Sequence, residues 1–555
     1  MKHSKLALLI SAAIFTSAGA YASDNNIVDV VQNGASNTAN VTQQVGSDNN
    51  DATIDQDGTS NVATVKQSDT SNTHAFVTQK GEGNEGTIKQ HNATQTATAT
   101  IDTRGNENDA TIEQEFNNGD EAEATITQRG GSNEAVISQY NGDGAVSAIN
   151  QFGSGDKAEI DNIWSDYATA TINQRGGPLN DAKVTQSDAD AAEAYISQNG
   201  TNNEGEIYQK TDENGSAPGV DDTRAELKQV GDSNTGYIEQ TALSSLADVY
   251  QNGNENKAEV FQSDYNNEAD VDQRGNNEIA YINQSGKNGY AKIDQGGNTD
   301  NFGSVIQGGY DNDATIKQRG SDHSATVNQS DYENEAIVNQ KGSDNIATIT
   351  QSGSMSGAGN KATVKQRGSK DEAEVIQIGE GNEAYVDQNS FSYENDIIIK
   401  QTGNDNYAGA ATFDGGDSLI EITQVGNGNI VSDQLPGASN VHGAGVGAAT
   451  YGAENKLTID QNGHNNNVYA DSSHSSSEVD IDQTGDLNTA IAESWLGTDN
   501  YIMISQTGTL HNADVFVNGA GNNMVSITQT DASNMANVTS IGNGNSVTVF
   551  QGTGM

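Results

Sequence analysis

The sequence predicts an all-β protein, a β-solenoid of stacked two-strand coils of about 22–24 residues with cross-β, amyloid-like stacking. Three observations support this fold class: a regular glutamine spacing, an alternating pattern before each glutamine, and two kinds of connecting segment. The longest unbroken series has an interval of eleven residues and comprises Gln229, Gln240, Gln251, Gln262, Gln273, Gln284 and Gln295.

Each of these glutamines closes a stretch that has the alternation of a β-strand. Val271 lies two residues before Gln273, and Ala269 lies four residues before it. Residues two apart point to the same face of a strand. The small residue, the aliphatic residue and the glutamine therefore share one face, and the polar residues that follow are expected to form an arc that returns the chain for the next strand.

The arcs between the strands alternate between a fixed length and a variable one. The fixed arcs mostly carry glycine two residues after the glutamine, which favours a positive φ angle there: Gly34, Gly58, Gly81, Gly105, Gly130 and Gly153. The variable arcs often carry Asp or Asn instead: Asp69, Asn92, Asn141, Asp188, Asp264 and Asp331. Two unlike arcs predict coils of two strands each.

Parallel, in-register stacking of such coils would place equivalent amide side chains above one another. A buried amide without partners costs about 1–3 kcal/mol, so we expect each amide to donate to one neighbouring coil and to accept from the other. The predicted ladder consists of Gln32, Gln43, Gln56, Asn61, Gln67, Gln229, Gln240, Gln251, Gln262, Gln273, Gln284, Gln295, Gln318, Gln329, Gln340, Gln351, Gln529 and Gln551.

The composition agrees with a thin core and excludes several classes of function. Only 33% of the residues are hydrophobic and 5% aromatic, and the formal net charge is −51. Such acidity argues against nucleic acid and anionic membranes as partners. The chain has no cysteine, which excludes disulfides and thiol chemistry.

Three segments are expected along the chain. Residues 1–22 have a basic start, an apolar run and the Ala20-Tyr21-Ala22 pattern of a secretory signal peptide cleaved before Ser23. Residues 23–388 read as a regular repeat solenoid. Residues 389–555 read as a degenerate continuation of it, because Ser472 and Val517 occupy positions that hold glutamine elsewhere. No later segment is apolar enough to insert into a membrane.

The repeat has the form Q-x-G-x-x-N-x-A-x-[IV]-x-Q, and one copy satisfies every position: Gln56, Gly58, Asn61, Ala63, Val65 and Gln67. With the secretory signal, this tandem pattern resembles the curlin family, the secreted subunits of curli-type amyloid fibres of Gram-negative bacteria. The resemblance is clearest from Gln32 to Gln388. It implies self-association into an axial homopolymer at the cell surface, a nucleator and an outer-membrane export pore as partners, and a role in biofilm matrix and adhesion. His323 replaces the asparagine of its unit.

Other chemistry is weakly represented. Asp270 and Asp272 flank Val271 on the outward face, where a solvated surface is the favoured interpretation and a calcium ion between stacked acidic arcs is the alternative. The histidines recur in no fixed column. No nucleophile motif, phosphate loop or zinc spacing is present, so we expect no enzyme activity, no cofactor and no metal.

Two functions remain open. The favoured one is a secreted structural protein that forms curli-like amyloid fibres for biofilm matrix, cell aggregation and surface adhesion. Its physical basis is that the first strand starts close to Ser23 and the last ends near Gln551, so that terminal edges are open to strand addition. The alternative is a monomeric surface adhesin whose inserts, Thr211–Val220 and Ser352–Gly359, bind a carbohydrate or host ligand.

Overall fold

The computed structural model describes residues 25–552 apart from 45, 93, 117–120, 211–222, 242, 354–356, 436–437 and 439–444. The expected signal peptide, residues 1–22, lies outside the described residues. The chain divides into two compact units, Met1–Asn266 and Asn267–Met555. The described residues form strands and no helix, and accordingly no membrane-spanning helix is found among them.

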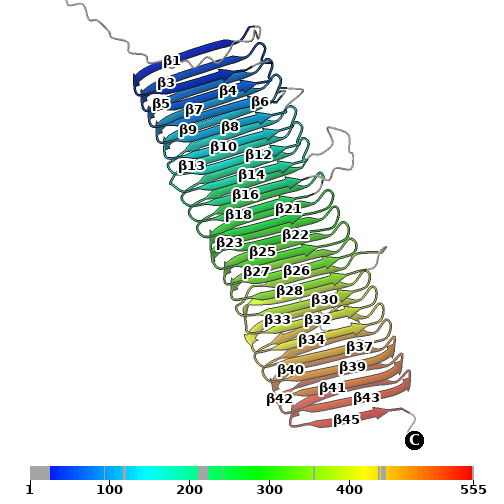
Figure 1. The fold of residues 1–555 in the computed structure, drawn as a ribbon. Coiled ribbons are helices and arrows are strands. Elements are labelled where there is room, and N and C mark those ends of the chain that lie inside the picture. Colours follow the sequence, from blue (N-terminus) through cyan, green and yellow to red (C-terminus); the bar gives the residue numbers. More distant parts are fainter. Residues whose placement is uncertain are drawn as a thin grey trace, which may run out of the picture. The chain divides into compact units, whose positions relative to one another are not determined.

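Within unit 1, two parallel sheets are formed by alternate strands (Figure 1). Sheet A contains β1 (Ile27–Ala35), β3 (Asp51–Thr59), β5 (His74–Glu82), β7 (Thr98–Asn106), β9 (Glu123–Gly131), β11 (Val146–Phe152), β13 (Thr169–Arg175), β15 (Glu193–Asn199), β17 (Arg224–Val230) and β19 (Leu246–Asn252). Sheet B contains β2 (Thr38–Gln43), β4 (Val62–Ser68), β6 (Glu85–His91), β8 (Asp109–Glu115), β10 (Glu134–Tyr140), β12 (Lys157–Ile163), β14 (Asp181–Ser187), β16 (Glu204–Lys210), β18 (Thr235–Gln240) and β20 (Lys257–Gln262).

Unit 2 repeats this arrangement. Its sheet A contains β21 (Glu268–Asn276), β23 (Tyr290–Thr299), β25 (Asp313–Ser321), β27 (Glu335–Ser343), β29 (Lys361–Gln366), β31 (Glu383–Tyr393), β33 (Tyr407–Gly416), β35 (Ile430–Val431), β36 (Ala448–Tyr451), β38 (Asn467–Ser473), β40 (Thr489–Thr498), β42 (Asn512–Gly521) and β44 (Met535–Asn543). Its sheet B contains β22 (Ile279–Gln284), β24 (Phe302–Gln307), β26 (Ser324–Ser330), β28 (Ile346–Ser352), β30 (Glu372–Ile378), β32 (Asp396–Thr402), β34 (Leu419–Val425), β37 (Lys456–Asn462), β39 (Glu478–Asp486), β41 (Tyr501–Thr509), β43 (Met524–Ala532) and β45 (Ser546–Gln551).

Every coil therefore consists of one strand from each sheet, and coils stack in parallel with equivalent residues in register. Between β25 and β27, Ala314 pairs with Ala336 and Gln318 with Gln340. The inward positions are buried and the positions between them are partly exposed, as the alternation in the sequence predicts. The predicted fold class, an all-β solenoid of two-strand coils, is confirmed.

The core between the two sheets is thin and is packed by pairs of complementary residues. Leu227 in sheet A of unit 1 branches at Cγ instead of at Cβ, where the Val or Ile of most equivalent positions branches. Its Cδ atoms lie 2.4 Å and 3.0 Å from where a Cβ of Gly236 and of Gly205 would be. Both glycines occupy positions that usually hold alanine. Two small residues in sheet B thus provide the volume that one leucine in sheet A fills.

The fixed arcs join sheet A to sheet B and bring the glycines of successive coils into backbone contact. Five of the six predicted glycines have φ between 108° and 129°, beyond the left-handed region that other residues tolerate, and Gly153 is the exception. In the variable arcs, Asp69, Asn92, Asn141, Asp188 and Asp331 have φ between 51° and 72°. These residues adopt the ordinary left-handed conformation, which Asn and Asp tolerate.

One insertion interrupts a strand instead of an arc. β35 and β36 both pair with β33 on one side and with β38 on the other, so they share one strand position in the stack of unit 2. The chain between them starts and ends in mid-strand. Val446, which precedes β36, packs with Ala411 and Ala449 on the outer face of this sheet. The sequence indicated a degenerate repeat in residues 389–555, but not an insertion inside a strand.

The glycine contacts yield a test of the stacking. A Cβ at Gly320 (φ 137°) would lie 2.0 Å from the carbonyl oxygen of Gly342. We expect Gly320→Ala to lower the free energy of unfolding by about 3 kcal/mol or more, from strain and overlap together. Gly308→Ala is the control, because a Cβ there meets only Ser285 Oγ at 3.7 Å. Urea unfolding followed by circular dichroism measures both variants, and equal midpoints would contradict the contact.

Candidate functional site

Within each unit, the predicted ladder glutamines lie in columns of side chains between the sheets, most of them amides. In sheet A the column comprises Gln32, Gln56, Gln79, Thr103, Gln128, Gln151, Gln174, Gln198, Gln229 and Gln251 in unit 1, and Gln273, Gln295, Gln318, Gln340, Gln366 and Gln388 in unit 2. In sheet B it comprises Gln43, Gln67, Gln90, Gln114, Gln139, Asn162, Gln186, Gln209, Gln240 and Gln262, and then Gln284, Gln307, Gln329, Gln351, Gln377, Gln401, Gln424, Gln461, Gln483, Gln506, Gln529 and Gln551.

Each interior glutamine makes hydrogen bonds along the stack and across it. The Nε2 of Gln318 donates to Oε1 of Gln340 at 2.9 Å and to the backbone carbonyl of Phe302 in sheet B at 2.8 Å. Its Oε1 accepts from Nε2 of Gln295 at 2.9 Å. Both amide hydrogens and the carbonyl oxygen are used although the side chain is fully buried. In both glutamine columns the side-chain amides donate in the same direction, from each coil to the next one along the chain.

More glutamines belong to the columns than the predicted set contains. Gln198 is an example: it accepts from Gln174 and donates to Gln229, both at 2.9 Å. The signal was present in the sequence, because Ile196 and Ala194 precede it with the same spacing. The columns differ beyond residue 388: sheet B keeps its glutamines, whereas sheet A has Thr412, Thr450, Ser472, Ser494, Val517 and Ser540 instead.

Two interruptions in unit 1 show how the columns depend on their neighbours. Asn162 is one methylene shorter than glutamine, and Ser147 of sheet A bridges the gap by accepting from Gln139 Nε2 at 3.0 Å and donating to Asn162 Oδ1 at 3.2 Å. The sequence signal for this bridge is a serine where alanine is usual. Thr103 has no such compensation: its Oγ1 and the Oε1 of Gln128 are buried without a hydrogen-bond partner.

A second kind of column consists of asparagines at the fixed arcs. Asn61 Oδ1 accepts from the backbone N–H and from Nδ2 of Asn84, both at 3.0 Å, and Asn61 Nδ2 donates to the carbonyl oxygen of Gly81 at 3.0 Å. The side-chain amide of Asn61 therefore joins its own arc to the arc of the next coil by hydrogen bonds. Asn61, the one asparagine in the predicted set, represents this column.

Three acidic residues replace asparagine in these columns and are fully buried: Asp156, Glu278 and Asp371. Asp156 Oδ1 accepts from the backbone N–H and from Nδ2 of Asn180, as an asparagine would. Its Oδ2 occupies the position of the amide donor and has no hydrogen-bond partner. A carboxylic acid, which retains a hydrogen on that oxygen, fits this position better than a carboxylate does.

Burial raises the pKa of all three carboxyl groups. The pKa of Asp371 rises to about 6 and that of Glu278 to about 7, because loss of solvation outweighs the hydrogen bonds from their neighbours. At Asp371, Ser392 Oγ lies 2.7 Å from Oδ2 and 2.5 Å from the carbonyl oxygen of Asn389. The single hydroxyl hydrogen of Ser392 can be donated to only one of these two oxygens. If it is donated to Asn389, a proton on Asp371 Oδ2 would supply the hydrogen bond to Ser392 Oγ.

His323 replaces asparagine with a different acceptor. Its Nδ1 accepts from the backbone N–H of Asn345 at 3.3 Å, and its Nε2 lies 3.4 Å from the carbonyl oxygen of Arg319. This pattern requires the neutral ring with its hydrogen on Nε2. Burial lowers the pKa of His323 in agreement with this form. His511 has the same arrangement with Asn534 and Thr507.

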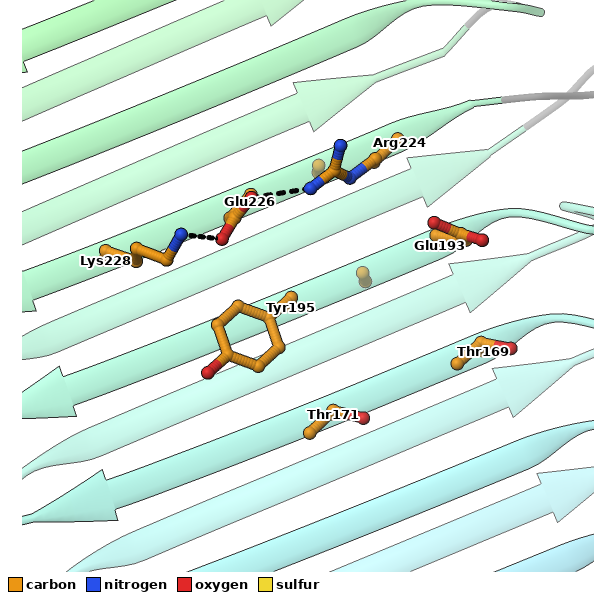
Figure 2. A pocket seen from close by; sticks show the side chains of 9 residues that line it. Thr169, Thr171, Glu193, Tyr195, Arg224, Glu226 and Lys228 are labelled. Carbon is orange, nitrogen blue, oxygen red and sulfur yellow. Dashed lines mark hydrogen bonds and ion pairs between the residues drawn. The ribbon is translucent and has the colours of Figure 1, made fainter.

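On the outer surface, the two aspartates singled out in the sequence, Asp270 and Asp272, each pair with a basic residue. Asp270 pairs with Lys292, and Asp272 pairs with Arg274 at 2.6 Å, so the two carboxylates do not form an acid pair. A depression of about 420 Å³ lies on sheet A of unit 1. Figure 2 shows side chains that line it, which include Tyr195, threonines and charged residues. Its acidic Glu226 is held between Arg224 and Lys228.

The glutamine column can be tested at one position. Gln318→Ala would leave the donor of Gln295 and the acceptor of Gln340 unpaired in the core, and we expect it to lower the free energy of unfolding by about 2–5 kcal/mol. Lys317→Ala is the control, since this exposed side chain makes only a 3.9 Å ion pair with Asp294. Similar urea midpoints for both variants would show that the column does not stabilise the stack.

The buried carboxyl groups predict a pH dependence. The folded pKa of Asp371, about 6, is raised above the ordinary aspartate value of 3.8, so its proton stabilises the folded state and stability falls as the pH rises from about 4 to 6. We expect Asp371→Asn to raise the free energy of unfolding by on the order of 2 kcal/mol at pH 8 and by little at pH 4. Urea unfolding at both pH values measures the difference. A gain that is equal at pH 4 and pH 8 would contradict a buried acid.

Comparison with known proteins agrees with this repeat geometry. No curated protein matches the chain. A family model, the curlin associated repeat, matches residues 47–81, 119–159, 221–253, 266–297, 299–330, 332–354, 357–389, 394–426, 452–485 and 497–530. The matches cover more than half of the chain and extend well beyond residue 388. The chain therefore belongs to the curlin-repeat family.

Proposed function

We propose that this protein is a secreted structural subunit that assembles end to end with copies of itself into curli-like amyloid fibres. The observation that carries this proposal is the set of glutamine columns, which have one direction and one spacing through each unit. Each added coil satisfies the amides of the coil before it. The sheet B column has glutamine in both its first and its last described coils, Gln43 and Gln551, so a second copy of the chain can extend this column by the same hydrogen bonds.

The first described strand illustrates the surface that such an addition would use. Among the described residues, β1 pairs with β3 alone. Gln32 donates to Gln56 at 2.6 Å, and no glutamine of the described chain donates to Gln32 Oε1. Val28 and Val31 are 43% and 47% exposed. An unpaired strand edge of this kind is a template for another strand.

The proposal also includes export and location. The residues before Ser23 have the pattern of a secretory signal, which supports transport out of the cytoplasm. Membership of the curlin-repeat family supports the surface of a Gram-negative bacterium as the destination, with a curli-type pore and a nucleator as partners. Biofilm matrix, cell aggregation and adhesion are the roles that such fibres would serve. No part of the proposal requires catalysis.

The alternative is a monomeric adhesin. Its expected binding loops fall largely outside the described residues, since 211–222 and 354–356 are not described. Three of the charged residues that line the depression, Arg224, Glu226 and Lys228, pair with one another (Figure 2). The amide columns therefore favour assembly over this alternative.

Assembly of residues 23–555 after dilution from denaturant tests the two functions. We expect fibres that bind thioflavin and show a repeat of about 4.8 Å in X-ray diffraction. Growth should accelerate in added salt, and as the pH falls toward the sequence pI of 4.1, because the net charge of −51 at pH 7 opposes stacking. Persistent soluble monomers would support the adhesin, and growth rates independent of pH and salt would contradict the electrostatic argument.

A further inference from the structure

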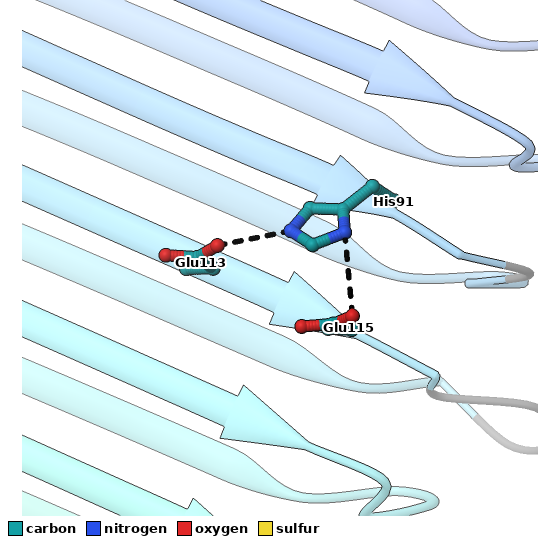
Figure 3. Close-up of side chains that lie close together, drawn as sticks. All are labelled: His91, Glu113 and Glu115. Carbon is teal, nitrogen blue, oxygen red and sulfur yellow. Dashed lines mark hydrogen bonds and ion pairs between the residues drawn. The ribbon is translucent and has the colours of Figure 1, made fainter.

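Three possible metal ligands meet where two neighbouring strands of unit 1 end. His91 closes β6 and Glu115 closes β8, and the two residues are paired in register. Glu113 lies two residues before Glu115 and points to the same outward face. Figure 3 shows the imidazole ring of His91 between the two carboxylates.

The distances suit a single ion. His91 Nε2 lies 2.9 Å from Glu113 Oε1, and His91 Nδ1 lies 3.6 Å from Glu115 Oε1. One ligand atom from each residue can be chosen so that all three lie within 4.8 Å of one another. Zinc bonds to nitrogen and oxygen are about 2.0–2.2 Å long. Glu113 and Glu115 approach different nitrogens of the ring, so binding one ion requires side-chain rotations that bring both carboxylates to the same nitrogen. Among the described residues, no other group of His, Asp and Glu meets this criterion.

The neighbouring charged groups leave ligand atoms of the three residues directed at one another. Lys89 Nζ lies 3.4 Å from Glu113 Oε2 and leaves Oε1 directed at the imidazole. Two carboxylates therefore face one imidazole, and Lys89 is the cation that pairs with one of them. The side chains of His91, Glu113 and Glu115 are 18%, 38% and 24% exposed, so an ion can enter from solvent.

We propose that His91, Glu113 and Glu115 bind one divalent transition-metal ion of the zinc class. One imidazole nitrogen and one oxygen from each carboxylate would be the protein ligands, and water would complete the coordination shell. The imidazole selects zinc-like ions over calcium and magnesium, which prefer sites made of oxygen alone. Because the ligands come from two successive coils, a bound ion would join β6 to β8 at the side of the variable arcs.

Titration of the full chain with Zn²⁺ in a calorimeter, with His91→Ala and His74→Ala as paired variants, tests the site. We expect about one high-affinity ion per chain, an affinity at least about 100-fold lower in His91→Ala, and no change in His74→Ala. His74 is an exposed histidine that stacks on Phe76 and has no place in the cluster. Absence of Zn²⁺ binding, or binding that survives His91→Ala, would overturn the proposal and leave His91 as an ion-pair partner.

Two further measurements separate ligand loss from misfolding. Zn²⁺ should raise the thermal midpoint of the wild type and leave that of His91→Ala unchanged, while both proteins have the same circular dichroism without metal. Lys89→Met removes the competing ammonium group from Glu113 and is expected to strengthen Zn²⁺ binding severalfold, whereas Glu113→Gln weakens it. Weaker binding in Lys89→Met, or tight binding of Ca²⁺ in competition with Zn²⁺, would contradict a zinc-class site.

Discussion

The constraint on which this structure depends is that amides are buried in a core only one side chain deep on each sheet. A buried amide needs partners, and the only groups within reach belong to the neighbouring coils at the same position. Gln318 meets this requirement with one glutamine on each side and one carbonyl of the facing sheet. A coil shifted by one residue would turn its glutamine outward and leave the amides of both neighbours unpaired, so the amides set the register more strictly than alanine and valine can.

A second constraint acts on the backbone and explains why the two arcs differ. At the fixed arcs the glycines of successive coils are in contact, and φ angles such as 126° at Gly105 are accessible only without a side chain. These arcs cannot vary in length without losing the contact. The opposite arcs turn through ordinary left-handed residues such as Asp69, which leaves room for insertions. Most of the length variation in the arcs, and the cluster of His91 with two glutamates, therefore occur on the side of the variable arcs, whereas the insertion between β35 and β36 lies within a strand position.

Departures from the repeat show that coils are coupled to their neighbours. Ser147 compensates for the short side chain of Asn162, and two glycines make room for Leu227. At Asp371 an acidic residue replaces the asparagine of the repeat, and burial raises the pKa of its carboxyl group. The stability of the stack therefore depends on pH. Stability of the folded chain and the proposed addition of further copies would respond to acid in the same direction.

The amino-acid sequence by itself determined the fold class, the two-strand coil and the inward face of each strand, because each of these follows from a spacing along the chain. It indicated only part of the set of glutamines that form the columns. Several features required the tertiary structure: the exposed cluster of His91, Glu113 and Glu115, the bridge through Ser147, and the insertion between β35 and β36 within one strand position. They involve residues that are about one coil or half a coil apart in positions with no fixed composition. Their proximity depends on how neighbouring coils are superposed, and a repeat pattern alone does not specify which of its irregular residues come into contact.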